Sequence, residues 1–360
     1  MDHPLLELAA DRTVVFDGAM GTEIQRRELA AADFGGLEGL NEILVRTRPD
    51  VIADIHRSYL EAGADVIETD SFGANAIVLR EYGVPELARG LARDAAALAV
   101  EVARAFPGGE GRRFVSGSIG PGTRLPSLGQ IDPEEMHGAF LDQSLGLLEG
   151  GVDLLQIETA QDPLQARIAV QACRDAMDRL GREVPIFVQV TFERTGRMLL
   201  GTEPLAAVTT LASLPGVDVF GVNCATGPEE MHGVLQVLSR ACPLPLSALP
   251  NAGLPENEGG RLVYRLTPGD FARHLRSFVT DLGVAFVGGC CGTTPDHIRE
   301  LVRALRGVRR GDRRPSLPAG VSSLFTAVSL RQEPRPLIIG ERTNANGSKA
   351  FREALSGGRW

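Results

Sequence analysis

The sequence predicts a single (β/α)8 barrel of the TIM type, followed by a linker and a fragment of a second α/β domain. Eight short aliphatic segments alternate with segments of helical periodicity. Alternation of this regularity is typical of a parallel sheet. Because the eight units occupy about 300 of the 360 residues, a closed barrel is favoured over an open, doubly wound sheet.

The strands and helices follow from this pattern in chain order. The expected strands are Thr13–Phe16, Asp65–Glu68, Phe114–Ser118, Asp153–Ile157, Pro185–Val190, Asp218–Val222, Pro245–Leu249 and Ala285–Gly288. The expected helices are Pro49–Ala62, Glu86–Ala105, Pro133–Glu149, Leu164–Leu180, Leu205–Leu214, Glu229–Leu238, Pro268–Leu282 and Pro295–Leu305. A capping residue followed by proline, as at Asp132, Thr267 and Thr294, marks where several of these helices begin.

The composition changes after Leu305, which divides the chain into three parts. Residues 1–305 form the expected barrel, and residues 306–335 are rich in Arg, Pro, Ser and Gly, as in a solvated linker. Residues 336–360 contain LIIGERTNANGSKAFREAL, which is typical of a strand, a polar loop and the first turns of a helix. No partner strand follows, so this segment is expected to be the truncated start of a second α/β domain.

Composition and missing motifs exclude several functions. A net charge of -9 argues against a nucleic-acid surface, which needs clustered positive charge. No apolar run is long enough to span a membrane, and the N-terminus lacks the pattern of a signal peptide, so we expect a soluble, cytoplasmic protein. The only lysine, Lys349, lies outside the barrel, which excludes Schiff-base catalysis within it. The glycines of GSIGPG, at 117–122, do not have the spacing of a dinucleotide-binding loop.

Three cysteines fall at the carboxyl ends of strands, where TIM barrels carry their reacting groups. The sixth expected strand ends at Cys224, and the eighth ends at the pair Cys290 and Cys291. Adjacent residues on a strand normally point to opposite faces, but the neighbouring glycines could let both sulfurs turn inward. Three thiolates with an open fourth position are the pattern of a catalytic zinc site. Cys173 and Cys242 are expected to be ordinary buried side chains.

A zinc ion with three thiolate ligands favours one kind of chemistry. Three thiolates leave the complex with a net charge of minus one, which makes it a poor activator of water but a good acceptor for a further soft thiolate. A free alkyl thiol with a pKa near 8.5 requires about 2 kcal/mol to deprotonate at pH 7. The sequence therefore predicts activation of a small thiol for alkylation.

Polar groups at other strand ends could bind the rest of such a substrate. Asp17 ends the first strand, and the amides of Gly18 and Ala19 open the next turn, which suits a carboxylate ligand. Glu158, after the fourth strand, or Asp17 could pair with an ammonium group. Further rim positions are Glu68, Thr69, Phe72 and Asn251. For each carboxylate, a capping or other structural role remains an alternative.

Together these segments resemble the zinc-dependent homocysteine S-methyltransferase family over nearly all of residues 10–305. The resemblance is carried by DGAMGTEIQ (17–25), ETDSFGAN (68–75), SIGPG (118–122), GVNCATGP (221–228), PNAGLP (250–255) and GGCCGTTPDHI (288–298). It implies that Cys224, Cys290 and Cys291 bind zinc. It also implies that Asp17 and Glu158 lie near the homocysteine amino group, with the Gly18 and Ala19 amides near the carboxylate.

The C-terminal segment resembles the start of the pterin-binding barrel in cobalamin-dependent methionine synthases. This resemblance implies that zinc-bound homocysteine thiolate attacks the methyl group of methylcobalamin to give methionine. The methyl group would come originally from methyltetrahydrofolate, and the pterin-binding and cobalamin-binding domains would be partners that this chain lacks. Three alternatives remain: a sulfonium or betaine methyl donor, a noncatalytic zinc module that docks partner domains, and a redox enzyme that uses a vicinal disulfide between Cys290 and Cys291.

Overall fold

Eight parallel strands form a closed barrel in the computed structural model, which describes residues 3–107, 113–259, 261–333 and 345–358. The strand order is β1-β10-β7-β6-β5-β4-β3-β2, so each barrel strand lies beside the barrel strands that come before and after it in the chain. The two ends of the sheet meet through a parallel bridge between Phe16 and Val66, and the Asp17 amide donates to the Val66 carbonyl. The predicted fold class is confirmed.

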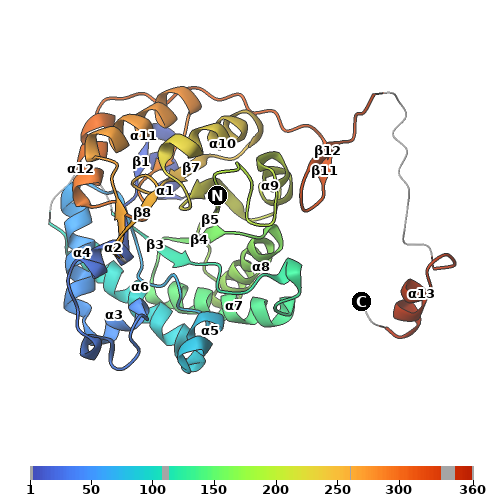
Figure 1. Ribbon diagram of the computed structural model, residues 1–360, viewed down its shortest axis with the longest axis horizontal. Coiled ribbons are helices and arrows are strands. Elements are labelled where there is room, and N and C mark those ends of the chain that lie inside the picture. The colour runs from blue at the N-terminus through green and yellow to red at the C-terminus, as the bar shows by residue number, and fades with distance from the viewer. Residues whose placement is uncertain (1–2, 108–112, 260, 334–344, 359–360) are drawn as a thin grey trace.

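Each predicted barrel strand and outer helix is present, with bounds that shift by a few residues (Figure 1). The barrel strands are β1 (Val14–Val15), β2 (Val66–Glu68), β3 (Phe114–Ile119), β4 (Leu154–Ala160), β5 (Ile186–Val190), β6 (Val217–Asn223), β7 (Leu246–Leu249) and β10 (Phe286–Val287). The outer helices are α4 (Pro49–Ala62), α6 (Ala88–Ala105), α7 (Pro133–Gly150), α8 (Pro163–Leu180), α9 (Pro204–Leu211), α10 (Pro228–Ala241), α11 (Pro268–Leu282) and α12 (Pro295–Leu305).

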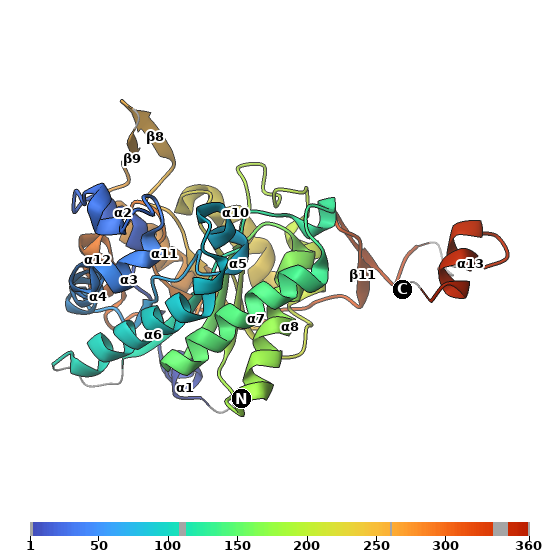
Figure 2. The same cartoon turned by 90° about the horizontal axis from the view of Figure 1, so that it is seen from below.

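The loops after the strands contain short elements that the sequence pattern did not indicate. These are α2 (Met20–Gln25), α3 (Leu44–Thr47), α5 (Ala76–Leu79) and the 3-10 turns Ala31–Phe34, Asn41–Ile43, Arg80–Tyr82, Pro85–Leu87 and Pro126–Leu128. An antiparallel hairpin of β8 (Pro255–Glu258) and β9 (Arg261–Tyr264) follows β7. In Figure 2 this hairpin rises from one end of the barrel, while the N-terminal helix α1 (Pro4–Asp11) lies at the opposite end.

The interior of the barrel is filled with side chains near the end that α1 covers. Leu5 and Ala9 of α1 pack with inward-facing strand residues, among them Phe16, Phe187 and Phe286. The rings of Phe187 and Phe286 lie 4.8 Å apart, edge to face. Filling this half leaves the carboxyl ends of the strands as the place for a site, as is general for this fold.

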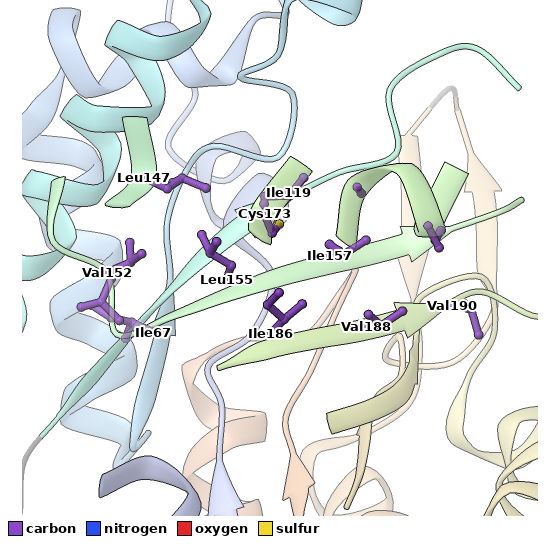
Figure 3. Packing of buried hydrophobic residues seen from close by; sticks show 14 of the residues in the cluster. Ile67, Ile119, Leu147, Val152, Leu155, Ile157, Cys173, Ile186, Val188 and Val190 are labelled. Atoms are coloured by element: carbon purple, nitrogen blue, oxygen red, sulfur yellow. The ribbon is translucent and has the colours of Figure 1, made fainter. Parts of the chain in front are cut away.

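The main hydrophobic core lies between the strands and the outer helices. Figure 3 shows Leu155 and Ile157 of β4, Ile186 and Val188 of β5, and Cys173 of α8 in this layer. The Cys173 thiol is fully buried, with its sulfur 3.5 Å from the Ser144 hydroxyl oxygen. Cys242 is also fully buried, so both cysteines that were predicted to be packing residues are confirmed as buried.

Residues after Leu305 begin by packing against the barrel. The Arg313 guanidinium donates to the carbonyl oxygens of Cys242 (2.6 Å) and Leu244 (2.9 Å), and the Gly311 amide donates to the Val279 carbonyl. A cation is favoured there because the carbonyls at the end of α10 lack helical partners. The segment predicted as a solvated linker therefore starts as part of the barrel surface.

The remainder of that segment contains a second hairpin, made of β11 (Gly320–Ser322) and β12 (Ala327–Ser329). It reaches α9, where the Glu203 amide donates to the Phe325 carbonyl at 2.9 Å. Helix α13 (Lys349–Ser356) is present where the sequence predicts a helix start, and the strand expected over LIIG lies outside the described residues. In the part of the chain that the structure describes, no helix combines the length and the apolar character needed to cross a membrane.

Candidate metal and substrate site

Cys224, Cys290 and Cys291 come together at the carboxyl end of the barrel. Their sulfur atoms all lie within 4.8 Å of one another, and the Cys224 and Cys291 sulfurs are 3.9 Å apart. In a tetrahedral zinc site with Zn–S bonds of about 2.3 Å, the sulfurs are about 3.8 Å apart. The three thiols are thus collected at the spacing of metal ligands, and no other such group of three occurs among the described residues.

The chain turns sharply to bring Cys224 to this position. Cys224 and Ala225 both have left-handed backbone conformations, with φ of 57° and 56°. Such values are uncommon for residues with a Cβ and cost of the order of 1 kcal/mol each. The turn is held by the Cys224 amide, which donates to the Leu249 carbonyl (3.1 Å), and by the Thr226 amide, which donates to the Cys224 carbonyl (2.7 Å). Strain of this kind at a strand end is typical of functional sites.

Glycines allow the Cys290–Cys291 turn to pack closely against its neighbours. A Cβ on Gly289 would lie 2.3 Å from the Thr293 hydroxyl oxygen, so a larger residue does not fit there. Gly292 has φ of +78°, which reverses the chain directly after the cysteines. The Cys290 amide donates to the Pro250 carbonyl at 2.9 Å, which ties the turn to the end of β7. The expected role of these glycines is confirmed.

The three thiols interact strongly with one another. Hydrogen bonds from Cys224 and Cys290 lower the pKa of the Cys291 thiol to about 3. Hydrogen bonding with Cys224 and Cys291 raises the pKa of the Cys290 thiol well above its usual value. Deprotonation of Cys291 is therefore favoured by its two neighbouring thiols. A bound dication deprotonates coordinating thiols outright, so this donor set fits a thiophilic metal such as zinc.

A group of three carboxylates, two of them buried and Glu68 half-buried, lies beside the cysteines. Asp17 follows β1, Glu68 ends β2 and Glu158 lies in β4. Among the described residues, no Arg, Lys or His offsets their charge. Burial, followed by repulsion from the Cys291 sulfur, raises the pKa of Glu158 to about 7. Burial and then mutual repulsion raise the pKa values of Asp17 and Glu68 well above normal. A bound ammonium group would relieve this uncompensated charge.

Hydrogen bonds fix the orientation of Glu158. Its carboxylate accepts from the Ser118 hydroxyl at 2.5 Å and from the Asn223 amide nitrogen at 3.1 Å. The Asn223 side chain also accepts from the Thr159 amide at 2.7 Å, so it is held at both ends. Since Asn223 directly precedes Cys224, the carboxylate and sulfur parts of the site share one support.

The amides after β1 are less available than the sequence suggested. The Ala19 amide donates to the Thr293 hydroxyl at 3.1 Å, and the Tyr59 hydroxyl donates to the Ala19 carbonyl at 3.2 Å. The Ala19 amide, which the sequence predicts to meet a carboxylate, therefore already has an acceptor, because Thr293 packs directly over this turn. A Cβ on Gly18 would lie 2.6 Å from the same hydroxyl oxygen. Asp17 keeps one buried carboxylate oxygen without a hydrogen-bond partner.

The other predicted rim residues have different environments. The Thr69 hydroxyl bonds the Ser71 hydroxyl at 2.6 Å and accepts from the Ser118 amide at 3.0 Å, so it supports the loop after β2. Phe72 is an exposed aromatic side chain, 43% accessible. The Asn251 side chain is buried just after β7, and its oxygen has no hydrogen-bond partner. Thr69 thus supports this loop, and contacts of Thr69, Phe72 and Asn251 with a substrate stay predictions.

Comparison with known proteins identifies the family. Residues 14–305 match the family model described as homocysteine S-methyltransferase. The chain belongs to the homocysteine S-methyltransferase family. It is 48% identical over 354 residues to a methionine synthase of Mycobacterium tuberculosis, and 48% identical over 359 residues to one of Mycobacterium leprae. Each match covers 98% of this chain but only 30% of the relative, so the chain spans less than a third of their length.

Solved structures of this family have the same fold. The oxidized form of the homocysteine methyltransferase MmuM from Escherichia coli is similar with a TM-score of 0.67 at 24% identity. The match covers 84% of this chain and 99% of that one. The metallated form of the same protein gives a TM-score of 0.65 at 24% identity. At this level of identity the likeness shows the barrel fold alone.

Sequence reasoning missed several residues of this site. Ser118 and Asn223, which orient Glu158, lie inside the recognised SIGPG and GVNC segments and could have been found from their positions at strand ends. Tyr264, whose ring packs against Gly292 beside the cysteine pair, could not, because it lies in a hairpin whose sequence, PENEGGRLVY, has no apolar alternation. Thr293 follows the cysteine pair, but nothing in the sequence links it to the turn at Ala19.

Proposed function

We propose that this chain binds homocysteine and transfers a methyl group to its sulfur, with one zinc ion held by Cys224, Cys290 and Cys291. The observation that carries the proposal is the juxtaposition of three thiols at metal-ligand spacing with buried carboxylates that lack a counter-charge. When bound, zinc would keep the substrate sulfur as a thiolate at neutral pH, the form that attacks an alkyl donor.

The carboxylates select the amino end of the substrate. Asp17 and Glu158 would accept N–H bonds from the ammonium group, and Ser118 and Asn223 hold Glu158 in place for it. Glu68 adds negative charge and is itself bonded by the Gln156 amide. Of the amides predicted to meet the substrate carboxylate, Gly18 stays a candidate, whereas Ala19 is already bonded to Thr293. Phe72 would lie at the entrance.

Methylcobalamin, bound by a domain outside this chain, is the methyl donor that we propose, with methionine as the product. This rests on the 48% identity to methionine synthases of which this chain spans 30%. It also rests on the resemblance of the sequence of residues 336–360 to the start of a pterin-binding barrel. Pterin-binding and cobalamin-binding domains would then be its partners. Because three reduced thiols are required, we infer a reducing compartment, the cytoplasm.

Zinc stoichiometry and zinc K-edge X-ray absorption with and without homocysteine test this function. We expect one zinc per chain, with three sulfur neighbours that rise to four when homocysteine is added. Cys224→Ala should abolish stoichiometric zinc, whereas the matched control Cys173→Ala should retain it. A reduced protein that binds no zinc, or zinc with four protein ligands that ignores homocysteine, would contradict the proposal. Methyl transfer from added methylcobalamin, compared with a sulfonium donor, then identifies the donor.

A further inference from the structure

Tyr264, the last residue of β9, lies directly against the cysteine turn. Its ring is half-buried beside Gly292, the residue after Cys291, and its hydroxyl and the Cys291 sulfur influence each other's pKa. A Cβ placed on Gly292 would lie 2.2 Å from the Tyr264 Cγ atom and 2.4 Å from its Cβ atom. The tyrosine ring thus occupies the space that any other residue at 292 would need. This contact fixes the ring next to the sulfurs.

The base of the β8–β9 hairpin is tied to the same turn by backbone bonds. The Ala252 amide donates to the Cys291 carbonyl at 2.9 Å, and the Leu266 amide donates to the Ala252 carbonyl at 3.1 Å. The Leu266 carbonyl in turn lies 2.9 Å from Nε2 of His297, a residue of α12. Because Tyr264 is two residues from this anchor, its backbone is held close to the cysteine turn. The hairpin stands at the end of the barrel away from α1 (Figure 2).

Charge explains why a hydroxyl donor is useful at this position. Three thiolates and a dication carry a net charge of minus one, and a substrate thiolate makes it minus two. The nearby carboxyl groups supply no positive charge to offset this, and the Cys291 sulfur repels the Glu158 carboxylate. The cysteines themselves cannot offset this charge, because a metal-bound thiolate has no S–H left to donate. A phenol O–H can take up part of it while remaining neutral, since hydrogen bonds to charged acceptors are the stronger ones.

We propose that Tyr264 is a positioning residue of the thiol site, whose hydroxyl donates to the Cys291 sulfur and so favours the addition of a fourth, substrate thiolate. This inference rests on the proposed function, because it assumes a substrate thiol that joins the three cysteine sulfurs. The effect acts at the sulfur end of the substrate. It should therefore extend to a simple alkyl thiol such as propanethiol, which has no amino or carboxyl group.

The cobalt-substituted chain with Tyr264→Phe tests the proposal, because this variant keeps the ring and loses only the hydroxyl. Without thiol, the sulfur-to-cobalt charge-transfer spectrum should match that of the unsubstituted chain. Affinity for both homocysteine and propanethiol should fall about tenfold. Tyr82→Phe, in a distant 3-10 turn, is the matched control and should bind both thiols normally. Glu158→Gln should weaken homocysteine but not propanethiol.

Two results would overturn the role assigned to Tyr264. Affinities of Tyr264→Phe within twofold of the unsubstituted chain for both thiols would show that the hydrogen bond has no effect. A changed cobalt spectrum in the thiol-free variant would instead make the tyrosine oxygen a metal ligand. Failure of the proposed function looks different, because the unsubstituted chain itself would then bind neither the metal nor homocysteine.

Discussion

The side-chain amide nitrogen of Asn223, at the end of β6, lies 3.1 Å from the carboxylate of Glu158 in β4, although β5 separates these two strands in the sheet. The same side chain accepts from the Thr159 amide, in a residue with a left-handed backbone, φ 56°. Asn223 is 1% exposed, so these bonds are shielded from water. Because Cys224 is the next residue, a single asparagine relates the position of the carboxylate to that of the sulfurs.

Replacing this asparagine should separate substrate binding from metal binding. In Asn223→Ala the Glu158 carboxylate loses a donor and the buried Thr159 amide loses its acceptor, so homocysteine should bind at least tenfold more weakly and the fold should lose about 1–3 kcal/mol. Zinc should still bind stoichiometrically, since no ligand is removed. Calorimetric titration with homocysteine and metal analysis of the same sample measure both. Unchanged homocysteine affinity would contradict a supporting role for Asn223.

Removal of the metal should lower thermal stability. A ligand that binds only the folded state stabilises it by about 4 kcal/mol at a thousand times its dissociation constant. We therefore expect a chelator to lower the melting temperature of the zinc-loaded chain, and re-addition of zinc to restore it. Cys290→Ala should show neither shift, whereas Cys173→Ala should show both from a lower starting point. A zinc-independent melting temperature in the unsubstituted chain would argue against a bound structural cross-link.

Glu158 should make the metal-free protein less stable as the pH rises. Its folded pKa of about 7 is above the ordinary value of 4.5, so the folded state holds a proton that the unfolded state has released. This contribution is fully present below pH 4.5 and is lost as the pH rises through 7, by up to about 3 kcal/mol. Urea titrations of the unsubstituted chain and of Glu158→Gln between pH 5 and 8 isolate it. Parallel stability curves for the two proteins would show that Glu158 does not titrate in this range.

Arg313 should matter for stability although it lies in the segment after the barrel. Arg313→Ala removes the donors to the Cys242 and Leu244 carbonyls, so we expect a loss of about 2 kcal/mol. The exposed neighbour Arg314 provides the matched control, since Arg314→Ala should change stability by less than about 0.5 kcal/mol. Chemical unfolding of both variants gives the comparison. Equal effects would mean that the packing of this segment contributes little.

The sequence was informative where one local rule sufficed. Strand and helix alternation predicted the barrel, and the rule that reacting groups follow the strands predicted that Cys224 and the Cys290–Cys291 pair would meet. What could not be predicted depends on partners distant in the chain. The Thr293 hydroxyl accepts a hydrogen bond from the Ala19 amide, which is 274 positions away in the chain. Tyr264 lies beside Cys291 although it belongs to a polar hairpin without strand periodicity. Arg313 was read as solvated because nothing local shows which carbonyls it would meet.

The cysteines lie close to the two shortest strands of the barrel, so a metal bound to them would also affect local stability. Strands β1 and β10 pair with each other and are only two residues long each, and two glycines separate the end of β10 from Cys290 and Cys291. An ion bound by Cys224 and Cys291 would cross-link two residues that are 67 positions apart in the chain. The cross-link would join the ends of β6 and β10, which lie on either side of β7. It would stabilise the barrel next to its two shortest strands. After a chelator removes the metal, amide hydrogen exchange should become faster first in β10 and β1, and only later in the longer strands β4 and β6.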